Sequence, residues 1–463
     1  MKPMTKKRYL FRLARARKLG VLVGCAWVGS LISPIVANAA GPVRPLADAF
    51  VAVGESPDPK NIALYTPSIE SLPSGRLVAS YSYTNRPKKV GESYLLTSDD
   101  AGKSWIKRAE SPTNQGRLFS AGGVLYYLAT RYVANPGNNP KGAPLSIQVS
   151  RDQGTTWSEP SDLRSEGVWH QTAANVWQAN GNVYLVMEQD VKRNISTWRV
   201  GSLAPILMRA KASADLTRPE AWSYATEITF QDVVPGYTEN EMKTDLFGIP
   251  FYKTSFPAAT QLGHGHNFPP PGWLECNVVQ ILDPNHIWHD PSGHTFHLFL
   301  RAHTGLTNYA AIAQVTEKPD GTMETELVKA PSGKTLLFVP FPGGQMRFHV
   351  VYDVETKLYW MLGSQTTDSM VRLDRMPEER YGRPDNERHR LVLHFSKNMI
   401  DWCFAGVVAI GPSPKQARHY ASMAIDGGDL VVLSRSADSR AANAHDGNLI
   451  TFHRVKNFRE LVY

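Results

Sequence analysis

The segment Ser98-Asp99-Asp100-Ala101-Gly102-Lys103-Ser104-Trp105 recurs fifty-two residues later as Ser150-Arg151-Asp152-Gln153-Gly154-Thr155-Thr156-Trp157. Both copies read Ser-x-Asp-x-Gly-x-(Ser/Thr)-Trp, and both follow a short apolar run. In such a segment Ser and Asp cap their own backbone in a tight turn, Gly supplies a positive φ, and Trp fills the gap between neighbouring sheets. Two copies at the spacing of one four-stranded sheet indicate a structural repeat, and repeats determine architecture.

The chain beyond residue 39 contains many short apolar segments separated by turn residues and lacks long stretches of helical period. This pattern is typical of an all-β protein with radial repetition or of a β-sandwich. Six units consist of an apolar strand, a polar turn and a second apolar strand; they span residues 64–83, 117–130, 171–188, 275–302, 346–364 and 419–434. Weaker copies of the turn motif begin at Ser213 and Ser396.

We therefore predict one all-β domain over residues 40–463, a six-bladed β-propeller. Residues 231–271, rich in Gly, Pro and aromatic side chains, fit no blade and are expected to form a loop insertion over one face. The strand at residues 448–455 is expected to close the ring on the first blade.

The first 39 residues have the pattern of a signal peptide. Eight basic residues and no acidic ones precede residue 19, an apolar stretch covers residues 19–36, and Ala37-Asn38-Ala39 offers a cleavage site before Ala40. We expect a secreted or periplasmic protein without stable membrane insertion after cleavage. The alternatives are a membrane anchor, weakened by the Gly, Ser and Pro residues in the stretch, and, less favoured, a lipoprotein attached at Cys25.

Charge and composition narrow the range of partners. The whole chain has 50 Lys and Arg residues against 42 Asp and Glu, but removal of the eight basic leader residues leaves a formally neutral protein. The basic character therefore indicates no nucleic-acid partner. Cys276 and Cys403 remain, and two buried apolar thiols are favoured over a disulfide.

No metal or cofactor is expected from the sequence, although a structural metal is left open. His264 and His266, and likewise His286 and His289, are close in sequence, but no zinc-like Cys/His spacing accompanies them.

Polar residues are concentrated where the inner strands of a propeller begin and where the second strands end. At the inner strands these are Tyr65, Arg117, His170, Glu275, Asn277, Arg347, His419 and Tyr420; at the second strands they are Glu188, Arg301 and His303. Solvated residues at strand ends are the simpler interpretation of each one alone. The whole set is better explained by a polar pocket around the axis.

The repeated octapeptide resembles the Asp box, or BNR repeat, of sialidase-like β-propellers. Glu275-Cys276-Asn277-Val278 is similar to the family segment whose Glu polarises a tyrosine nucleophile, and Tyr420 stands in the place of that tyrosine. Arg301 and Arg390 match two carboxylate-binding arginines of the family. The resemblance covers four blades in the expected order, and it implies a sialidase-like fold.

Two departures from the family pattern argue against an ordinary sialidase. Tyr65, in Leu64-Tyr65-Thr66-Pro67, stands where the family has its third carboxylate-binding arginine. Residues 80–86 contain no counterpart of the general-acid aspartate, although Arg86 or Arg117 could take the place of the missing arginine in space. Loss of the acid would remove about 10²–10⁴ in rate.

The remaining residues suit β-elimination from a uronic acid. Arg117, Arg301, Arg347 and Arg390 are candidates to neutralise a sugar carboxylate, because guanidinium groups match it bidentately. His170, His303, His419 and Tyr420 are candidates for the base and the acid. We therefore expect an enzyme for acidic oligo- or polysaccharides, a polysaccharide lyase that resembles the propeller lyases only in fold and residue types. The alternatives are sialidase-type hydrolysis by Tyr420 with Glu275, and a non-catalytic glycan-binding propeller.

Overall fold

The computed structural model describes residues 44–463 except residues 86, 89, 134–140, 171, 172, 196, 197, 235, 238–259, 262–266, 269, 270, 306, 370, 372–375 and 378–386. The predicted signal peptide lies outside the described residues, as do Arg86, His264, His266 and most of the predicted loop insertion.

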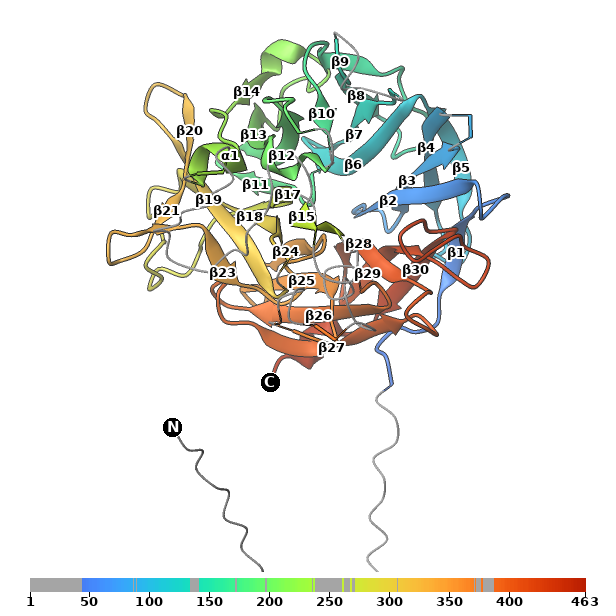
Figure 1. Ribbon diagram of the computed structural model, residues 1–463. Helices are drawn as coiled ribbons and strands as arrows, with labels where there is room; N and C mark the ends of the chain where they lie inside the picture. Colours follow the sequence, from blue (N-terminus) through green and yellow to red (C-terminus); the bar gives the residue numbers. More distant parts are fainter. Residues whose placement is uncertain are drawn as a thin grey trace, which may run out of the picture. The chain divides into compact units, whose positions relative to one another are not determined.

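The described residues form six antiparallel sheets arranged as blades around a central axis, which confirms the predicted six-bladed β-propeller (Figure 1). Blade 1 contains β2 (Ile62–Ser71), β3 (Leu77–Asn85), β4 (Val90–Ser98) and β5 (Ile106–Ser111). Blade 2 contains β6 (Thr113–Ala121), β7 (Val124–Arg131), β8 (Leu145–Ser150) and β9 (Ser161–Arg164). Blade 3 contains β10 (Trp169–His170), β11 (Trp177–Ala179), β12 (Asn182–Asp190), β13 (Leu203–Lys211) and β14 (Trp222–Tyr224).

The second half of the ring continues in the same way. Blade 4 contains β17 (Gly272–Val279), β18 (Thr295–His303), β19 (Tyr309–Glu317), β20 (Met323–Glu326) and β23 (Phe338–Pro340). Blade 5 contains β24 (His349–Asp353), β25 (Leu358–Ser364), β26 (Arg390–Ser396) and β27 (Cys403–Ile410), and blade 6 contains β28 (Arg418–Asp426), β29 (Asp429–Ser436), β30 (Leu449–Val455) and β1 (Val51–Glu55). Outside the blades lie α1 (Phe230–Val233) and two small hairpins, β15 (Thr260–Gln261) with β16 (Asn267–Phe268) and β21 (Val328–Lys329) with β22 (Thr335–Leu336). Among the described residues, short 3₁₀ helices cover Arg199–Gly201, Pro219–Ala221 and Phe458–Leu461.

The ring is closed by the N-terminal strand, and the expected closure by residues 448–455 is wrong. β30 is the third strand of blade 6, and β1 pairs with it antiparallel, with Val51 opposite Phe452 (Figure 1). The first and last strands of the domain thus share one sheet, which ties the two ends of the ring together by backbone hydrogen bonds.

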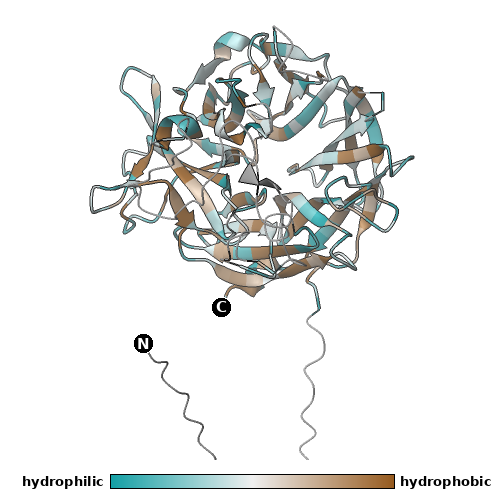
Figure 2. Ribbon diagram, viewed as in Figure 1, coloured by the Kyte–Doolittle hydropathy of each residue, from teal (hydrophilic) through white to brown (hydrophobic). Residues whose placement is uncertain are grey.

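Hydrophobic side chains fill the spaces between neighbouring blades. One buried cluster joins blades 2 and 3, another joins blades 5 and 6, and a third joins blades 6 and 1. Figure 2 shows hydrophobic residues along the strands and hydrophilic residues in the outer loops. This burial, at about 25 cal/mol per Å² of apolar surface, holds each blade against the next.

The two repeated octapeptides fold into the same turn. In the first copy the hydroxyl of Ser98 accepts the Gly102 N–H at 2.9 Å, and Asp100 accepts both the backbone and the hydroxyl of Ser104. Ser150, Asp152 and Thr156 make the corresponding bonds in the second copy. Each turn is thus closed by its own polar side chains.

Each octapeptide also packs against the preceding blade. The ring of Trp105 meets Phe452 of blade 6 edge-on, with centroids 5.6 Å apart, and Trp157 joins the cluster between blades 1 and 2. Gly102 has a φ of 88°, and a Cβ added to it would lie 2.2 Å from a ring carbon of Phe452. Glycine is therefore required there for two separate reasons.

We predict that Gly102→Ala lowers the free energy of unfolding by about 2–5 kcal/mol, because overpacking adds to the strain of a left-handed residue. Gly75→Ala is the matched control: its φ is 84°, yet a Cβ there meets nothing within 4 Å. The control is expected to cost only about 1–2 kcal/mol. Urea denaturation of both variants measures the difference, and equal losses would contradict the packing role of the turn.

Candidate functional site

In the part of the chain that the structure describes, four inner strands carry a bulge near their first residues. The register shifts lie between Tyr65 and Ser68, Asn114 and Arg117, Leu274 and Asn277, and His419 and Ser422. Each contains a non-glycine residue in the left-handed region: Thr66, Gln115, Glu275 and Tyr420, with φ between 47° and 58°. Such residues cost about 1–3 kcal/mol each and cluster at functional sites, where a bulge redirects a side chain. Two of the four are predicted catalytic residues, Glu275 and Tyr420.

Arg301 links these two residues. Its Nη1 donates to the phenol oxygen of Tyr420 and lies 3.3 Å from Oε2 of Glu275. The Nε of Arg301 donates to the carbonyl oxygen of Gln345 at 2.7 Å, which fixes the direction of the guanidinium. Glu275 is 1% exposed and Arg301 4% exposed, so this ion pair is formed in a desolvated environment. The structure thus brings together three residues that are far apart in the sequence.

Two further arginines complete a cluster around the Tyr420 ring. The guanidinium carbons of Arg435, Arg388 and Arg301 lie 4.9, 5.4 and 6.0 Å from the ring centre. Arg388 also places Nη1 3.0 Å from Nδ1 of His419. We call Tyr420, Glu275, Arg301, Arg388 and Arg435 the Tyr420 cluster.

The Tyr420 cluster has an excess of positive charge in a buried place. Burial lowers the pKa of Arg388, and the charge of Arg301 adds to this effect. Burial lowers the pKa of Arg435 to about 10, with a further contribution from Arg388. Three guanidinium groups surround the Tyr420 ring, while Glu275 lies beside Arg301 and Asp446 near Arg435. Positive charge is therefore in excess, and an anion placed among the arginines would relieve their mutual repulsion.

Tyr65, the residue that replaces an arginine of the family pattern, lies beside this cluster. The guanidinium carbon of Arg435 lies 4.3 Å from the Tyr65 ring centre. The Tyr65 hydroxyl donates to Oδ1 of Asp446 at 2.7 Å. Arg435 therefore supplies a positive charge next to the place that lacks the expected arginine.

Glu188 and Arg347 also interact with the segment that carries Glu275. Oε1 of Glu188 accepts the backbone N–H of Cys276 at 3.1 Å, and Arg347 donates to the carbonyl oxygen of Ala173 at 3.2 Å. Burial raises the pKa of Glu188 well above its ordinary value, and the negative charge of Glu275 raises it further. Burial lowers the pKa of Arg347, while Glu275, Tyr420 and Glu188 oppose that change. Glu188, Arg347, Glu275 and Tyr420 therefore influence one another's charge.

We predict that Glu188→Gln stabilises the protein increasingly as the pH rises. A carboxyl with a raised native pKa contributes stability that is complete below the unfolded value, near 4.5, and is lost as the pH rises through the native value. The glutamine variant has no such loss. Its unfolding free energy relative to wild type should increase between about pH 5 and pH 8, measured by urea denaturation. A difference independent of pH would contradict the raised pKa of Glu188.

Arg117 and Asn277 tie blades together by hydrogen bonds. Nη1 of Arg117 donates to the hydroxyl of Ser422 at 2.8 Å, and Nη2 lies 2.9 Å from the ring of His349. Burial lowers the pKa of Arg117 to about 9, and the charge of Arg347 contributes. The side-chain amide of Asn277 donates to the carbonyl oxygen of Phe348 and accepts the N–H of Val350. These hydrogen bonds join the two residues to blades 5 and 6 rather than to the phenol of Tyr420.

The three predicted histidines have different surroundings. His419 is fully buried behind Arg388, and burial and the neighbouring arginines hold its pKa well below the ordinary value. His303, at the end of β18, has its pKa lowered to about 3 by burial and by Arg301. The ring of His170 lies 6.1 Å from that of Trp198, and burial lowers its pKa to about 4. All three are therefore neutral at pH 7.

Of the two arginines in Arg388-His389-Arg390, the structure places Arg388 and not Arg390 beside Tyr420. Nη2 of Arg390 donates to Glu387 at 2.8 Å and to Thr367 at 2.7 Å. The sequence interpretation also missed Arg435, although a signal for it exists. Arg435 pairs with His419 on the second strand of blade 6, as Arg301 pairs with Leu274 on the second strand of blade 4. A blade-by-blade comparison of strand ends would have found it.

The structure also shows the surroundings of the cysteines and of one pair of histidines noted in the sequence. Cys276 and Cys403 are both free thiols, the first buried and the second only partly buried. Nδ1 of His289 donates to the carbonyl oxygen of Ile281, and Nδ1 of His286 accepts the N–H of Trp288. Within the described ranges no three His, Cys, Asp or Glu side chains group as metal ligands. No helix in the same part of the chain has the length and apolar character needed to cross a membrane.

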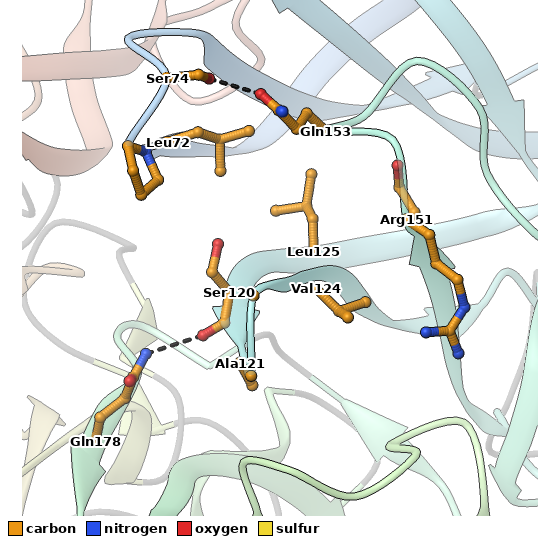
Figure 3. A pocket seen from close by; sticks show the side chains of 13 residues that line it. Leu72, Ser74, Ser120, Ala121, Val124, Leu125, Arg151, Gln153 and Gln178 are labelled. Atoms are coloured by element: carbon orange, nitrogen blue, oxygen red, sulfur yellow. Dashed lines mark hydrogen bonds between the residues drawn. The ribbon is translucent and has the colours of Figure 1, made fainter.

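A cavity of about 460 Å³ lies away from the Tyr420 cluster, between the β2–β3 turn, the β6–β7 turn and the second octapeptide (Figure 3). Two hydrogen bonds border it, from Ser74 to Gln153 and from Gln178 to the carbonyl oxygen of Ser120. These turns follow the last residues of the inner strands, whereas Tyr65 and Tyr420 lie near the first residues. The cavity therefore belongs to the opposite end of the blades.

Comparisons with known proteins show the fold. No family model matches the sequence, and no curated protein matches it either. A mutant Trypanosoma rangeli sialidase with trans-sialidase activity is 13% identical over 90% of this chain and 60% of its own chain, with a TM-score of 0.50. A Hadza microbial sialidase is 14% identical over 88% of this chain and 68% of its own, also with a TM-score of 0.50. A Penicillium chrysogenum α-L-arabinanase is 12% identical over 90% of this chain and 100% of its own, with a TM-score of 0.46. The domain thus has a six-bladed propeller fold like that of these sialidases.

Proposed function

We propose that this protein is a carbohydrate-active enzyme that cleaves acidic glycans by β-elimination at a uronic acid. The observation that carries the proposal is the convergence of Arg301, Arg388 and Arg435 on the phenol of Tyr420. Structures of similar fold are glycoside hydrolases, which supports a carbohydrate substrate. The predicted leader at residues 1–39 would place the reaction outside the cytoplasm.

The carboxylate of the sugar is assigned to Arg388 and Arg435. Both are 3% exposed, and a guanidinium group in a desolvated place binds a carboxylate by strong, charge-assisted hydrogen bonds. Neutralisation of the carboxylate makes the proton on C5 of the sugar more acidic, because the carbanion formed by its removal delocalises onto the carboxylate.

Tyr420 is assigned the role of the acid. Its oxygen accepts a hydrogen bond from Arg301, so its own O–H can donate to the glycosidic oxygen on C4. In the elimination a base removes the C5 proton, the C5–H electrons form the C4=C5 double bond, and the C4–O electrons pass to the leaving oxygen. That oxygen takes the proton of Tyr420, and the positive charge of Arg301 stabilises the negative charge that develops on the phenol oxygen.

Sialidase-type hydrolysis is the second candidate. It is favoured by the order of Glu275, Arg301 and Tyr420 along the chain and by their proximity. It requires Glu275 to act as the base for Tyr420. In the structure Glu275 contacts the guanidinium of Arg301, and no hydrogen bond joins it to Tyr420 among the described residues. This arrangement supports the elimination.

The test is incubation of the purified protein with a panel of uronate-containing polysaccharides and with sialyl-lactose. The proposal predicts an unsaturated product, detected by the ultraviolet absorbance of its C4=C5 double bond, and no free sialic acid. Release of sialic acid without an unsaturated product would establish hydrolysis instead. Glycan binding without either product would identify a binding propeller.

A further inference from the structure

A histidine–aspartate pair lies at the solvent-exposed side of the Tyr420 cluster. Nδ1 of His445 lies 2.8 Å from Oδ1 of Asp446, and the two side chains are 54% and 6% exposed. They belong to the loop between β29 and β30. The His445 ring lies 6.1 Å from the ring of Tyr65, which in turn lies against Arg435. The pair therefore adjoins the arginines assigned to the carboxylate.

The surroundings hold this pair in one orientation. Oδ1 of Asp446 also accepts the hydroxyl of Tyr65, and Oδ2 accepts the side-chain amide of Asn443 at 2.7 Å. A guanidinium N–H of Arg435 donates to the backbone carbonyl of His445. Three residues, two from strands and one from the loop itself, thus hold the His445–Asp446 pair in place.

The hydrogen bond to Asp446 also determines the tautomer of His445. Because a carboxylate can only accept, Nδ1 carries the hydrogen and Nε2 carries the lone pair. Among the described residues nothing hydrogen-bonds to this Nε2. His445 therefore presents a basic nitrogen whose opposite side is oriented by a carboxylate, the arrangement by which a general base is activated.

The charges around His445 keep it neutral before the reaction. Partial burial lowers its pKa, the hydrogen bond to Asp446 raises it, and the positive charges of Arg435 and Arg388 lower it. His419 also interacts with His445, but its pKa lies well below the ordinary value, so it carries no positive charge at pH 7. Tyr65 and Asn443 are uncharged. A neutral imidazole at pH 7 is the form that accepts a proton.

We propose that His445 is the base of the elimination, with Asp446 as its positioning residue, an inference that rests on the proposed function. Nε2 of His445 takes the C5 proton, and the C5–H electron pair becomes the second bond between C4 and C5. The C4–O pair leaves with the glycosidic oxygen, which takes the Tyr420 proton. The resulting imidazolium faces the Asp446 carboxylate and the phenolate faces Arg301, and solvent returns the two protons.

The test compares His445→Ala with a matched control, His294→Ala. Nδ1 of His294 also lies 2.8 Å from a carboxylate, that of Glu317, and its side chain is 52% exposed, but it precedes β18 and so lies at the opposite end of that strand from Arg301. We expect His445→Ala to lower kcat by about 10²–10⁴-fold with little change in KM, and added imidazole to restore part of the rate. The acid limb of the pH–rate profile, which reports protonation of His445, should disappear. His294→Ala should match wild type in rate and profile.

The results for wild type and for His445→Ala distinguish a failure of this inference from a failure of the proposed function. If wild type forms an unsaturated product and His445→Ala retains its rate and its acid limb, the inference is overturned and the lyase stands. If wild type forms no unsaturated product from any uronate, the proposed function fails and the inference falls with it. A rate loss in His445→Ala without imidazole rescue and with an unchanged acid limb would mark a structural role and also overturn the inference. Thermal unfolding of both variants verifies that they are folded.

Discussion

Replacing Tyr420 with phenylalanine is expected to lower kcat by about 10²–10⁴-fold while KM stays within a few-fold of wild type. The change removes only the hydroxyl that Arg301 contacts and leaves the ring against Arg388 and Arg435. The leaving oxygen then departs without a proton donor, so the loss falls on the chemical step and not on binding.

Tyr224→Phe is the matched control for this variant. Tyr224 also has a guanidinium on its ring, that of Arg164 at 4.1 Å, but it lies on the outermost strand of blade 3. Steady-state kinetics of the control should equal those of wild type. If Tyr420→Phe retained wild-type kcat, Tyr420 would be excluded as the acid.

Replacing Arg388 with lysine is expected to lower kcat/KM by about 10–100-fold, with much of the loss in KM. A lysine keeps the charge but loses the planar fork that pairs with a carboxylate, and a hydrogen bond to a charged group contributes about 1.5–3 kcal/mol. The change also removes the contact with His419. Kinetics over a range of uronate concentrations separate the two parameters.

Arg390→Lys provides the control from the same segment. Arg390 is bound to Glu387 and Thr367 rather than facing Tyr420. Its replacement should change kcat/KM less than that of Arg388. The reverse order of effects would show that the carboxylate lies nearer Arg390, as the sequence resemblance implies.

The fold could be predicted from the sequence because its signals are local. A turn such as Ser150–Trp157 is closed by hydrogen bonds from its own side chains. Short apolar strands that recur between such turns are compatible with few folds, of which a propeller is one. The closure of the ring could not be predicted in the same way. Whether β1 joins the first or the last blade depends on which strand, far away in the sequence, has an unpaired edge. The residues of β1 alone do not reveal that partner, which is β30.

The candidate site could be predicted only in part. Glu275 and Tyr420 stand where inner strands begin and Arg301 where a second strand ends, and all three match segments of the family resemblance, so the sequence predicts them. Arg388 and Arg390 are two residues apart, and such residues share a face in an extended chain, so spacing cannot distinguish them. His445 lies in a loop, where position depends on tertiary contacts such as the bond from Arg435.

The central claim is that buried arginines around Tyr420 serve elimination at a uronic acid. The most direct measurement follows the ultraviolet absorbance of uronate-containing polysaccharides with wild type and with Tyr420→Phe, in parallel with an assay for saturated reducing sugars. The account predicts an unsaturated product from wild type and its near-complete loss in the variant. Saturated sugars from wild type without unsaturated product would contradict it.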